Sequence, residues 1–131
     1  MKTFVLDTHV LSWHLLSPKK IGKRARLLLR EVDAGKAVAI VPSAVLLELG
    51  LLSEANRKTL SLAEASALFE SHSGFSVEPL TRAHAEDFAR LTSLVDPFDR
   101  MIVATARVLD LPLLTADQRI SQSHLVDVIW D

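Results

Sequence analysis

The sequence predicts an α/β fold in which a parallel β-sheet of about five strands is flanked by helices on both faces. Short apolar runs of strand type alternate along the chain with longer segments whose apolar residues recur every three or four positions. The strand-like runs are apolar throughout, which is typical of parallel strands covered on both sides. With 131 residues, 49% of them hydrophobic, the chain has the size of one domain, and we expect a single domain over residues 1–131.

Five segments are expected to form the strands. Each is short, apolar and bounded by polar or turn-forming residues. In chain order they are residues 2–6, 37–41, 75–80, 111–115 and 126–130.

Six segments show helical periodicity, and several have recognisable ends. Gly35 stops the second helix, Ser61 and Glu64 form a Ser-x-x-Glu capping box, and Thr81 caps the fifth helix. The expected helices cover residues 10–17, 21–35, 44–53 (opened by Pro42 and Ser43), 61–74, 81–95 and 97–110.

Composition excludes several classes of protein. Fifteen basic and sixteen acidic residues give a net charge of −1, which argues against a globally basic coat for nucleic acid. Without cysteine there are no disulfides and no thiolate zinc sites, and the five histidines show no metal-binding spacing. Acidic and histidine residues interrupt the first apolar run, which therefore reads as mature structure, and no apolar run is long enough to span a membrane. We expect a cytoplasmic protein.

Two aspartates directly follow predicted strands. Ligands of open parallel sheets bind beyond the carboxyl ends of the strands. Asp7 follows the first strand and Asp117 the fourth, so both are expected on the same edge of the sheet. Taken alone, each of them is more often a helix cap or turn residue than a functional one.

Glu48 lies on a predicted helix where the positions three and four residues away are apolar. Burying an unpaired carboxylate in such surroundings costs on the order of several kcal/mol. The Glu48 carboxylate is therefore expected to contact a cation, to accept hydrogen bonds or to be protonated. A buried ion pair with an arginine is the alternative to a functional role.

The stretch "DPFDR" places two further acids before an apolar helix. Asp96 can be the N-cap, Pro97 the first helical residue and Asp99 the second member of an Asp-x-x-Asp capping box. That interpretation uses both acids for structure alone. Asp99 nevertheless lies in the first turn of this helix, where the chain is expected to be close to the edge of the sheet.

Asp7, Glu48, Asp99 and Asp117 can thus converge on one small region. Carboxylates at such range raise one another's pKa values, and a divalent cation among them stabilises their charged form. Oxygen ligands favour Mg²⁺ or Mn²⁺, one or two ions, and such sites suit hydrolysis of phosphodiester bonds. Three hydroxyl groups can orient metal-bound water or hydrogen-bond the acids, or can be plain caps: Thr8, Ser43 and Thr115.

Four motifs carry a resemblance to a known family. The stretches "LDTHVL", "PSAVLLE", "DPFDRMIVATA" and "LLTADQRI" resemble, in order and spacing, the PIN-domain ribonucleases of the VapC type, which are toxins of bacterial toxin–antitoxin pairs. The resemblance implies a PIN-like nuclease domain and a Mg²⁺- or Mn²⁺-dependent endoribonuclease with Asp7, Glu48, Asp99 and Asp117 as its acidic site. It also implies cleavage of structured RNA, often tRNA, to 5′-phosphate and 3′-hydroxyl ends, a homodimer, and a cognate antitoxin that covers the active site.

The sequence departs from the family pattern at one place. Many relatives carry a further acidic or amide residue shortly after the position of Asp117, whereas Gln118 and Arg119 follow here. Asp96 can compensate by helping to hold a second metal ion.

Basic residues after the first helix suggest contacts with RNA phosphates. They are Lys19, Lys20, Lys23, Arg24, Arg26 and Arg30. A solvated helix face explains them equally well. Arg100 can clamp a phosphate near the metals or form a salt bridge with Asp96. For Trp13 we favour packing over a dimer contact.

Other functions fit less well. An aspartyl-phosphate phosphatase needs a second acid two residues after Asp7, where His9 stands. A receiver domain has the same weakness and needs a late lysine, but Lys58 is the last one. A PIN-like module that only binds RNA or a protein remains the alternative from another class, and the intact acids argue against it.

Overall fold

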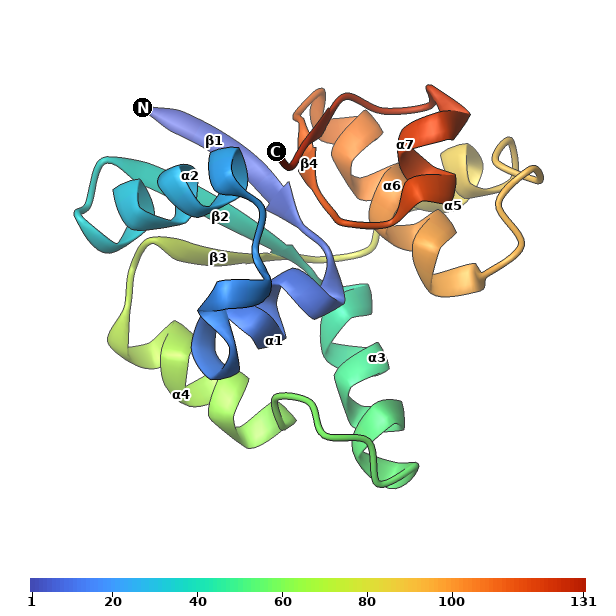
Figure 1. Ribbon diagram of the computed structural model, residues 1–131. Helices are drawn as coiled ribbons and strands as arrows, with labels where there is room; N and C mark the ends of the chain where they lie inside the picture. The colour runs from blue at the N-terminus through green and yellow to red at the C-terminus, as the bar shows by residue number, and fades with distance from the viewer.

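The computed structural model covers residues 1–131 and contains one five-stranded sheet. The strands stand in the order β3-β2-β1-β4-β5, and every neighbouring pair is parallel (Figure 1). Their bounds are β1 (Lys2–Leu6), β2 (Ala37–Pro42), β3 (Phe75–Glu78), β4 (Leu113–Leu114) and β5 (Val128–Ile129). The predicted α/β class is confirmed, although β4 and β5 have only two residues each.

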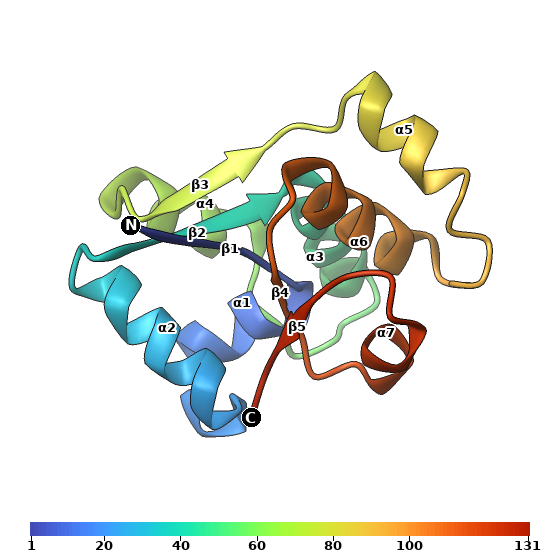
Figure 2. The same ribbon diagram turned by 90° about the horizontal axis from the view of Figure 1, so that it is seen from above.

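Helices cover both faces of this sheet. Helix α2 packs against β2, while α6 contacts β1 and β2, and Figure 2 shows α2 and α6 on opposite sides of the sheet. The helices are α1 (Thr8–Leu16), the 3₁₀ turn η1 (Pro18–Lys20), α2 (Lys23–Asp33), α3 (Ser43–Glu54), α4 (Leu62–Ser71), α5 (Arg82–Phe88), α6 (Pro97–Leu109) and α7 (Gln118–Ser123).

The predicted helix ends are confirmed where a cap defines them. The Ser61 hydroxyl accepts the Glu64 N–H at 3.1 Å, and the Glu64 carboxylate accepts the Ser61 N–H at 3.0 Å. Gly35 follows α2 with a φ of 75°, a conformation that favours glycine.

The expected helix over residues 81–95 is wrong in its second half. Helix α5 ends at Phe88, and turns follow it. Leu91 and Leu94 lie in these turns, and their side chains are buried in the core. Their three-residue spacing therefore resembles a helical period although no helix is present. The short α7 was not predicted, because six residues are too few to show a period.

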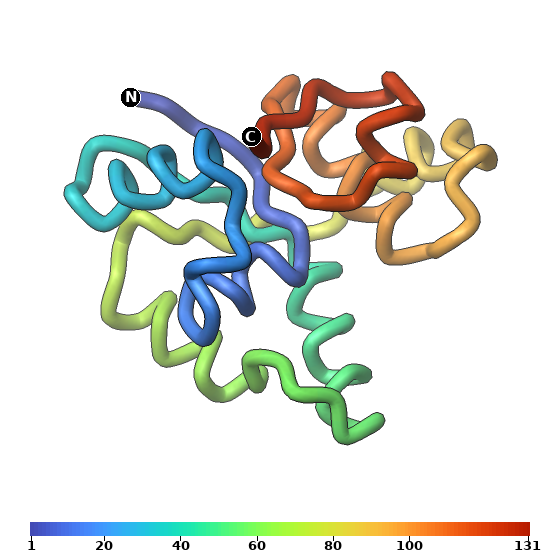
Figure 3. The backbone as a smooth tube through the Cα atoms, viewed as in Figure 1, coloured from blue at the N-terminus to red at the C-terminus, as the bar shows by residue number.

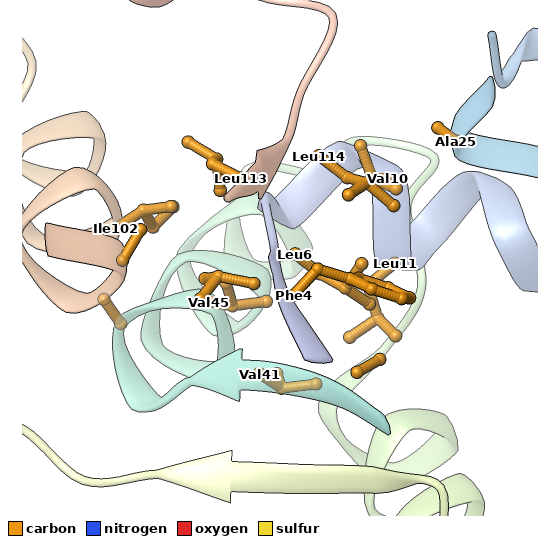
Figure 4. Packing of buried hydrophobic residues seen from close by; sticks show 14 of the residues in the cluster. Phe4, Leu6, Val10, Leu11, Ala25, Val41, Val45, Ile102, Leu113 and Leu114 are labelled. Carbon is orange, nitrogen blue, oxygen red and sulfur yellow. The ribbon is translucent and has the colours of Figure 1, made fainter. Parts of the chain in front are cut away.

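The buried apolar residues form one cluster around β1. Phe4, Val5 and Leu6 of this central strand are almost fully buried. Figure 4 shows Phe4 and Leu6 between Val41 on β2 and the two leucines of β4. Burial on both faces explains why the strands are apolar throughout.

The carboxyl ends of β1 and β4 lie side by side. Leu6 pairs with Leu114, and the Asp7 N–H donates to the Leu114 carbonyl at 3.2 Å. The chain order reverses between these two strands, because β2 continues the sheet on one side of β1 and β4 on the other. Helix α3 starts beside this edge and extends away from the sheet (Figure 3). This switch point is where ligands of parallel sheets bind.

Candidate active site

Residues from four parts of the sequence line one cleft at the carboxyl edge of the sheet. The cleft has a volume of about 310 Å³. Its lining consists of Asp7, His9, Trp13, Glu48, Asp96, Asp99, Ala116, Asp117 and Arg119. The structure thus brings together all four acids predicted for the site, with Asp96 as a fifth.

Asp7 is the most deeply buried of these acids. As the N-cap of α1 it accepts the Thr8 N–H at 2.6 Å, and its other oxygen accepts the Thr115 hydroxyl at 2.6 Å. Burial raises the pKa of the Asp7 carboxyl group above its ordinary value, and these hydrogen bonds act in the opposite direction. Its orientation is therefore fixed by one strand-end hydroxyl and one helix N-terminus.

Glu48 lies in the second turn of α3 and accepts a hydrogen bond from the Thr8 hydroxyl. No arginine or lysine pairs with it, so the buried ion pair is not formed. The expected apolar surroundings are partly wrong, because Leu47 and Leu51 point to solvent, 58% and 52% exposed. Burial still raises the pKa of Glu48, and the charges of Asp7 and Asp96 add to this effect.

Asp96 and Asp99 have different roles at the start of α6. The Asp96 carboxylate accepts the N–H groups of Phe98 at 2.8 Å and Asp99 at 3.1 Å and thus caps the helix. The Asp99 carboxyl group returns no hydrogen bond, so only half of the expected capping box exists. Burial, followed by the charges of the four other acids, raises the pKa of Asp99 to about 7.

Asp117 caps α7. Its carboxylate accepts the N–H groups of Arg119 at 2.8 Å and Ile120 at 3.3 Å, and its own N–H donates to the Thr115 hydroxyl at 3.0 Å. The Arg119 guanidinium lies 3.9 Å from the same carboxylate. The cap that we considered as an alternative is thus present, at the edge of the acidic cleft.

Two buried threonines connect the acids. Thr8 donates to Glu48, and Thr115 joins Asp7 to the backbone of Asp117. Both threonines are fully buried. Ser43, the third predicted hydroxyl, begins α3 but is not part of the cleft lining.

The donor chemistry of the cleft fits a hard divalent cation. Five carboxyl groups face one arginine there, and the charges of the other four contribute to the raised pKa of Asp99. A cation would relieve this repulsion, and oxygen ligands select Mg²⁺ or Mn²⁺. No three acidic or histidine side chains already converge closely enough to enclose a metal ion, so binding requires the carboxylates to turn toward one another.

The predicted role of Arg100 finds no support in its position. Its guanidinium donates to the carbonyls of Leu94 and Thr92 and lies over the Phe88 ring, 5.3 Å from the centroid. It therefore holds the loop before α6 and does not form the Asp96 salt bridge, while the phosphate clamp stays a prediction. The sequence does not reveal which way a guanidinium turns.

Arg119 is the arginine that lines the cleft, and His9 lines it too. Our reading of the sequence gave neither of them a role in the site. The available signal was their spacing, since each stands two residues after a cleft aspartate, at the start of a helix.

The predicted basic segment is exposed beside the cleft. Lys19 and Lys20 lie in η1, and Lys23 and Arg24 begin α2. The Lys20 ammonium is 5.9 Å from the centroid of the Trp13 ring, which itself lines the cleft. This contact connects the basic segment with the acidic site.

A larger cavity, of about 550 Å³, lies at the opposite edge of the sheet. Leu111, Pro112 and Asp127 belong to it, and they precede β4 and β5. Its central charges neutralise each other, because Arg107 pairs with Asp87 at 2.8 Å. The smaller cleft, where five acids face one arginine at the switch point, is therefore the better candidate for an active site.

Fold and cleft together define an α/β domain with an acidic site at the switch point of a parallel sheet. The chain belongs to the PIN domain family, whose model matches residues 4–124. PIN domains form a family of nucleases. A comparison with curated proteins gave no match. None of the helices combines the length and hydrophobicity needed to cross a membrane.

Solved structures of VapBC systems are similar to this fold. VapBC2 from Rickettsia felis, bound to a promoter DNA fragment, gives a TM-score of 0.70 at 16% identity, covering 98% of this chain and 99% of that one. DNA-bound VapBC from Salmonella typhimurium gives 0.64 at 21% identity and 98% coverage of both chains. VapBC-5 from Mycobacterium tuberculosis, a toxin–antitoxin system, gives 0.64 at 23% identity and the same coverage.

Proposed function

We propose that the protein is a metal-dependent endoribonuclease that hydrolyses phosphodiester bonds in RNA and acts as a VapC-type toxin. One observation carries the proposal. The Asp99 carboxyl group has no structural partner and faces four other acids in the cleft of a PIN domain. Helix α6 is capped by Asp96 without it, so a structural role does not explain this acid.

Asp7, Glu48, Asp99 and Asp117 would hold one or two Mg²⁺ or Mn²⁺ ions. Bound at this site, the metal supplies an electrophile that activates water and neutralises charge on the phosphate. Thr8 and Thr115 keep Glu48 and Asp7 oriented for this task through their hydroxyl groups. Asp96 uses only one carboxylate oxygen for the cap, and its other oxygen would assist a second ion.

Water as the nucleophile determines the products. Attack on phosphorus with departure of the 3′ oxygen leaves a 5′-phosphate and a 3′-hydroxyl. The 2′-hydroxyl of the substrate takes no part, so a 2′,3′-cyclic phosphate among the products would contradict this mechanism. Structured RNA, tRNA in particular, is the proposed substrate, and Lys19, Lys20, Lys23 and Arg24 are the proposed phosphate contacts.

The first test compares cleavage of total tRNA by the wild type and Asp99→Asn with Mg²⁺, Mn²⁺ or EDTA. We expect EDTA to abolish cleavage and the substitution to reduce it by more than about a hundredfold, beyond the usual effect of residues that only support a metal ligand. Asp110→Asn is the matched control, because Asp110 ends the same helix at a φ of 54°, which asparagine tolerates. Equal cleavage by wild type and Asp99→Asn would reject the four-acid site.

We also propose that two copies of the chain associate through α3. A groove on this helix is lined by Leu46, Leu47, Gly50, Leu51, Glu54, Leu62 and Phe98. An added Cβ at Gly50 would meet nothing within 4 Å, so no contact inside the chain needs glycine there. Glycine inside a helix costs about 0.5–1 kcal/mol relative to alanine, and close approach of a second helix would account for it. A symmetric dimer places the same apolar patch on both copies.

A cognate antitoxin is the proposed regulator. The fold resembles that of VapBC structures, and such a partner would meet the toxin in the cytoplasm, where its RNA substrate is found. Five carboxyl groups in the cleft favour a basic segment of the antitoxin as the part that covers it.

A further inference from the structure

One wall of the acidic cleft is aromatic. His9 and Trp13 stand one helical turn apart on α1, with ring centroids 5.8 Å apart and planes tilted by 31°. Both residues line the cleft beside Asp7, Glu48 and Asp99. His9 is exposed and Trp13 is only partly buried, so flat ring surface borders the acids.

Neighbouring residues support this wall from outside the cleft. The Trp130 ring lies 6.0 Å from Trp13, and the Lys20 ammonium lies 5.9 Å from the Trp13 centroid. Trp130 itself is not part of the cleft lining. Of the two tryptophans in the chain, only Trp13 borders the acidic site.

The charge of the cleft makes such a wall useful for a nucleic-acid substrate. Five carboxyl groups repel a phosphate backbone, and Arg119 is the one arginine among them. The proposed cations would offset this repulsion at the scissile phosphate, but the neighbouring nucleotides need a contact of another kind. Stacking of bases on aromatic rings does not depend on charge and tolerates any base, because every base has a π face.

We propose that Trp13, together with His9, stacks an unpaired base of the substrate next to the scissile phosphate, while Lys20 contacts a neighbouring phosphate. The inference rests on the proposed nuclease function and adds the part of the site that selects the substrate. A base inside a duplex has both faces covered by its neighbours, so a stacking wall selects RNA with an unpaired nucleotide at the cleavage position.

Tryptophan fluorescence tests the contact directly, since the chain has only two tryptophans. In an Asp99→Asn background, Trp130→Phe leaves Trp13 as the single fluorophore, and Trp13→Phe leaves Trp130. The probe is a single-stranded oligoribonucleotide of mixed sequence, whose binding is followed independently by the anisotropy of a labelled copy. We expect RNA to quench Trp13 and to leave Trp130 unchanged. Bound RNA without quenching of Trp13, or no binding at all, would overturn the proposal.

Kinetics separate this inference from the proposed function. Trp13→Leu should raise the KM for single-stranded RNA by roughly tenfold or more, as expected for loss of one stacked base, with a smaller change in kcat. Trp130→Phe is the control, because it keeps an aromatic ring beside Trp13, and it should leave KM unchanged. His9→Ala is a second variant at an exposed position and should raise KM in the same direction without unfolding the chain.

The possible failures are distinguishable. If the wild type does not cleave RNA, the nuclease function fails. If the wild type cleaves and both Trp13→Leu and His9→Ala keep its KM, the nuclease stands and the stacking wall is wrong. Equal cleavage of fully paired duplex and single-stranded RNA would also overturn the selection of unpaired bases.

Discussion

Two aspartates three positions apart, Asp96 and Asp99, show how position decides the role of a residue. Asp96 gives one carboxylate oxygen to two backbone N–H groups and caps α6. Asp99 is turned into a cleft where burial and like charges raise its pKa to about 7. The sequence alone allowed both to be caps, and only the structure separates the two roles.

The raised pKa of Asp99 makes the stability of the metal-free protein depend on pH. The folded chain keeps this proton up to about pH 7, whereas the ordinary pKa is 3.8. Between these values the folded state binds more protons than the unfolded state, so the free energy of unfolding falls as pH rises. Burial shifts the pKa values of Asp7 and Glu48 in the same direction.

We therefore expect a higher Tm at pH 5 than at pH 7.5 in EDTA, measured by thermal unfolding. Asp99→Asn should reduce this difference, and Asp110→Asn should not. A Tm that rises with pH over this range would contradict the assigned environment of Asp99.

Thr115 tests whether the acids depend on their hydrogen-bond partners. Thr115→Val keeps the shape but removes the donor to Asp7 and the acceptor of the Asp117 N–H. We expect a loss of about 1–3 kcal/mol in the free energy of unfolding, because the buried Asp7 carboxylate loses a hydrogen-bond donor and the half-buried Asp117 N–H loses its acceptor. Cleavage should fall by roughly tenfold or more.

Urea unfolding and cleavage rates measure these two effects. Thr105→Val is the matched control, since Thr105 is equally buried and its hydroxyl donates only to the Met101 carbonyl within α6. If both threonine variants behave alike, the connection between Thr115 and the acids has no functional weight.

At the scale of elements, one ion pair joins α5, α6 and the segment before β5. Arg107 on α6 contacts both Asp87 oxygens, at 2.8 and 3.2 Å, and donates to the Leu125 carbonyl at 2.8 Å. Asp87 is buried, and its remaining cation, Arg90, is 3.7 Å away. Removal of Arg107 therefore leaves a buried carboxylate poorly paired.

Arg107→Met should lower the free energy of unfolding by roughly 1–3 kcal/mol, less than for a fully buried pair, because the Arg107 side chain is 33% exposed. Arg82→Met is the control, because the Arg82 side chain is 93% exposed and its pair with Glu86 should contribute less than about 1 kcal/mol. Chemical denaturation gives both values. Activity of the folded fraction should stay unchanged, since the pair lies at the edge opposite the cleft.

The order and type of the long elements could be predicted from the sequence, but some ends could not. Caps such as Ser61 and Asp96 are local, so the sequence contains all that defines them. The end of α5 depends on tertiary burial of Leu91 and Leu94, which no local signal distinguishes from a helical period.

At the scale of the whole molecule, the candidate site could be predicted because topology brings strand ends together. A parallel sheet places Asp7 and Asp117 on one edge whatever the details of packing. Side-chain direction follows from contacts that the sequence does not show. For this reason the salt bridge between Arg100 and Asp96 that the sequence allowed is not formed, and Arg119 was missed.

The oligomeric state is a property of this same scale. We expect the wild type to sediment as a dimer and a Leu47→Glu, Leu51→Glu variant as a monomer, because charges in an apolar interface are left without partners. Leu27→Glu is the matched control, with a leucine as exposed as Leu51 but located on α2. A monomeric wild type, or a dimeric double variant, would reject the α3 interface.

The hydrogen bond between Thr115 and Asp7 joins residues 108 positions apart. A chain still growing on the ribosome has Asp7 and Glu48 early, but β4 and Asp117 can take their places only after most of the domain has emerged. A chain truncated before β4 therefore lacks both Asp117 and the hydroxyl that orients Asp7, and under the proposed function it should not cleave RNA.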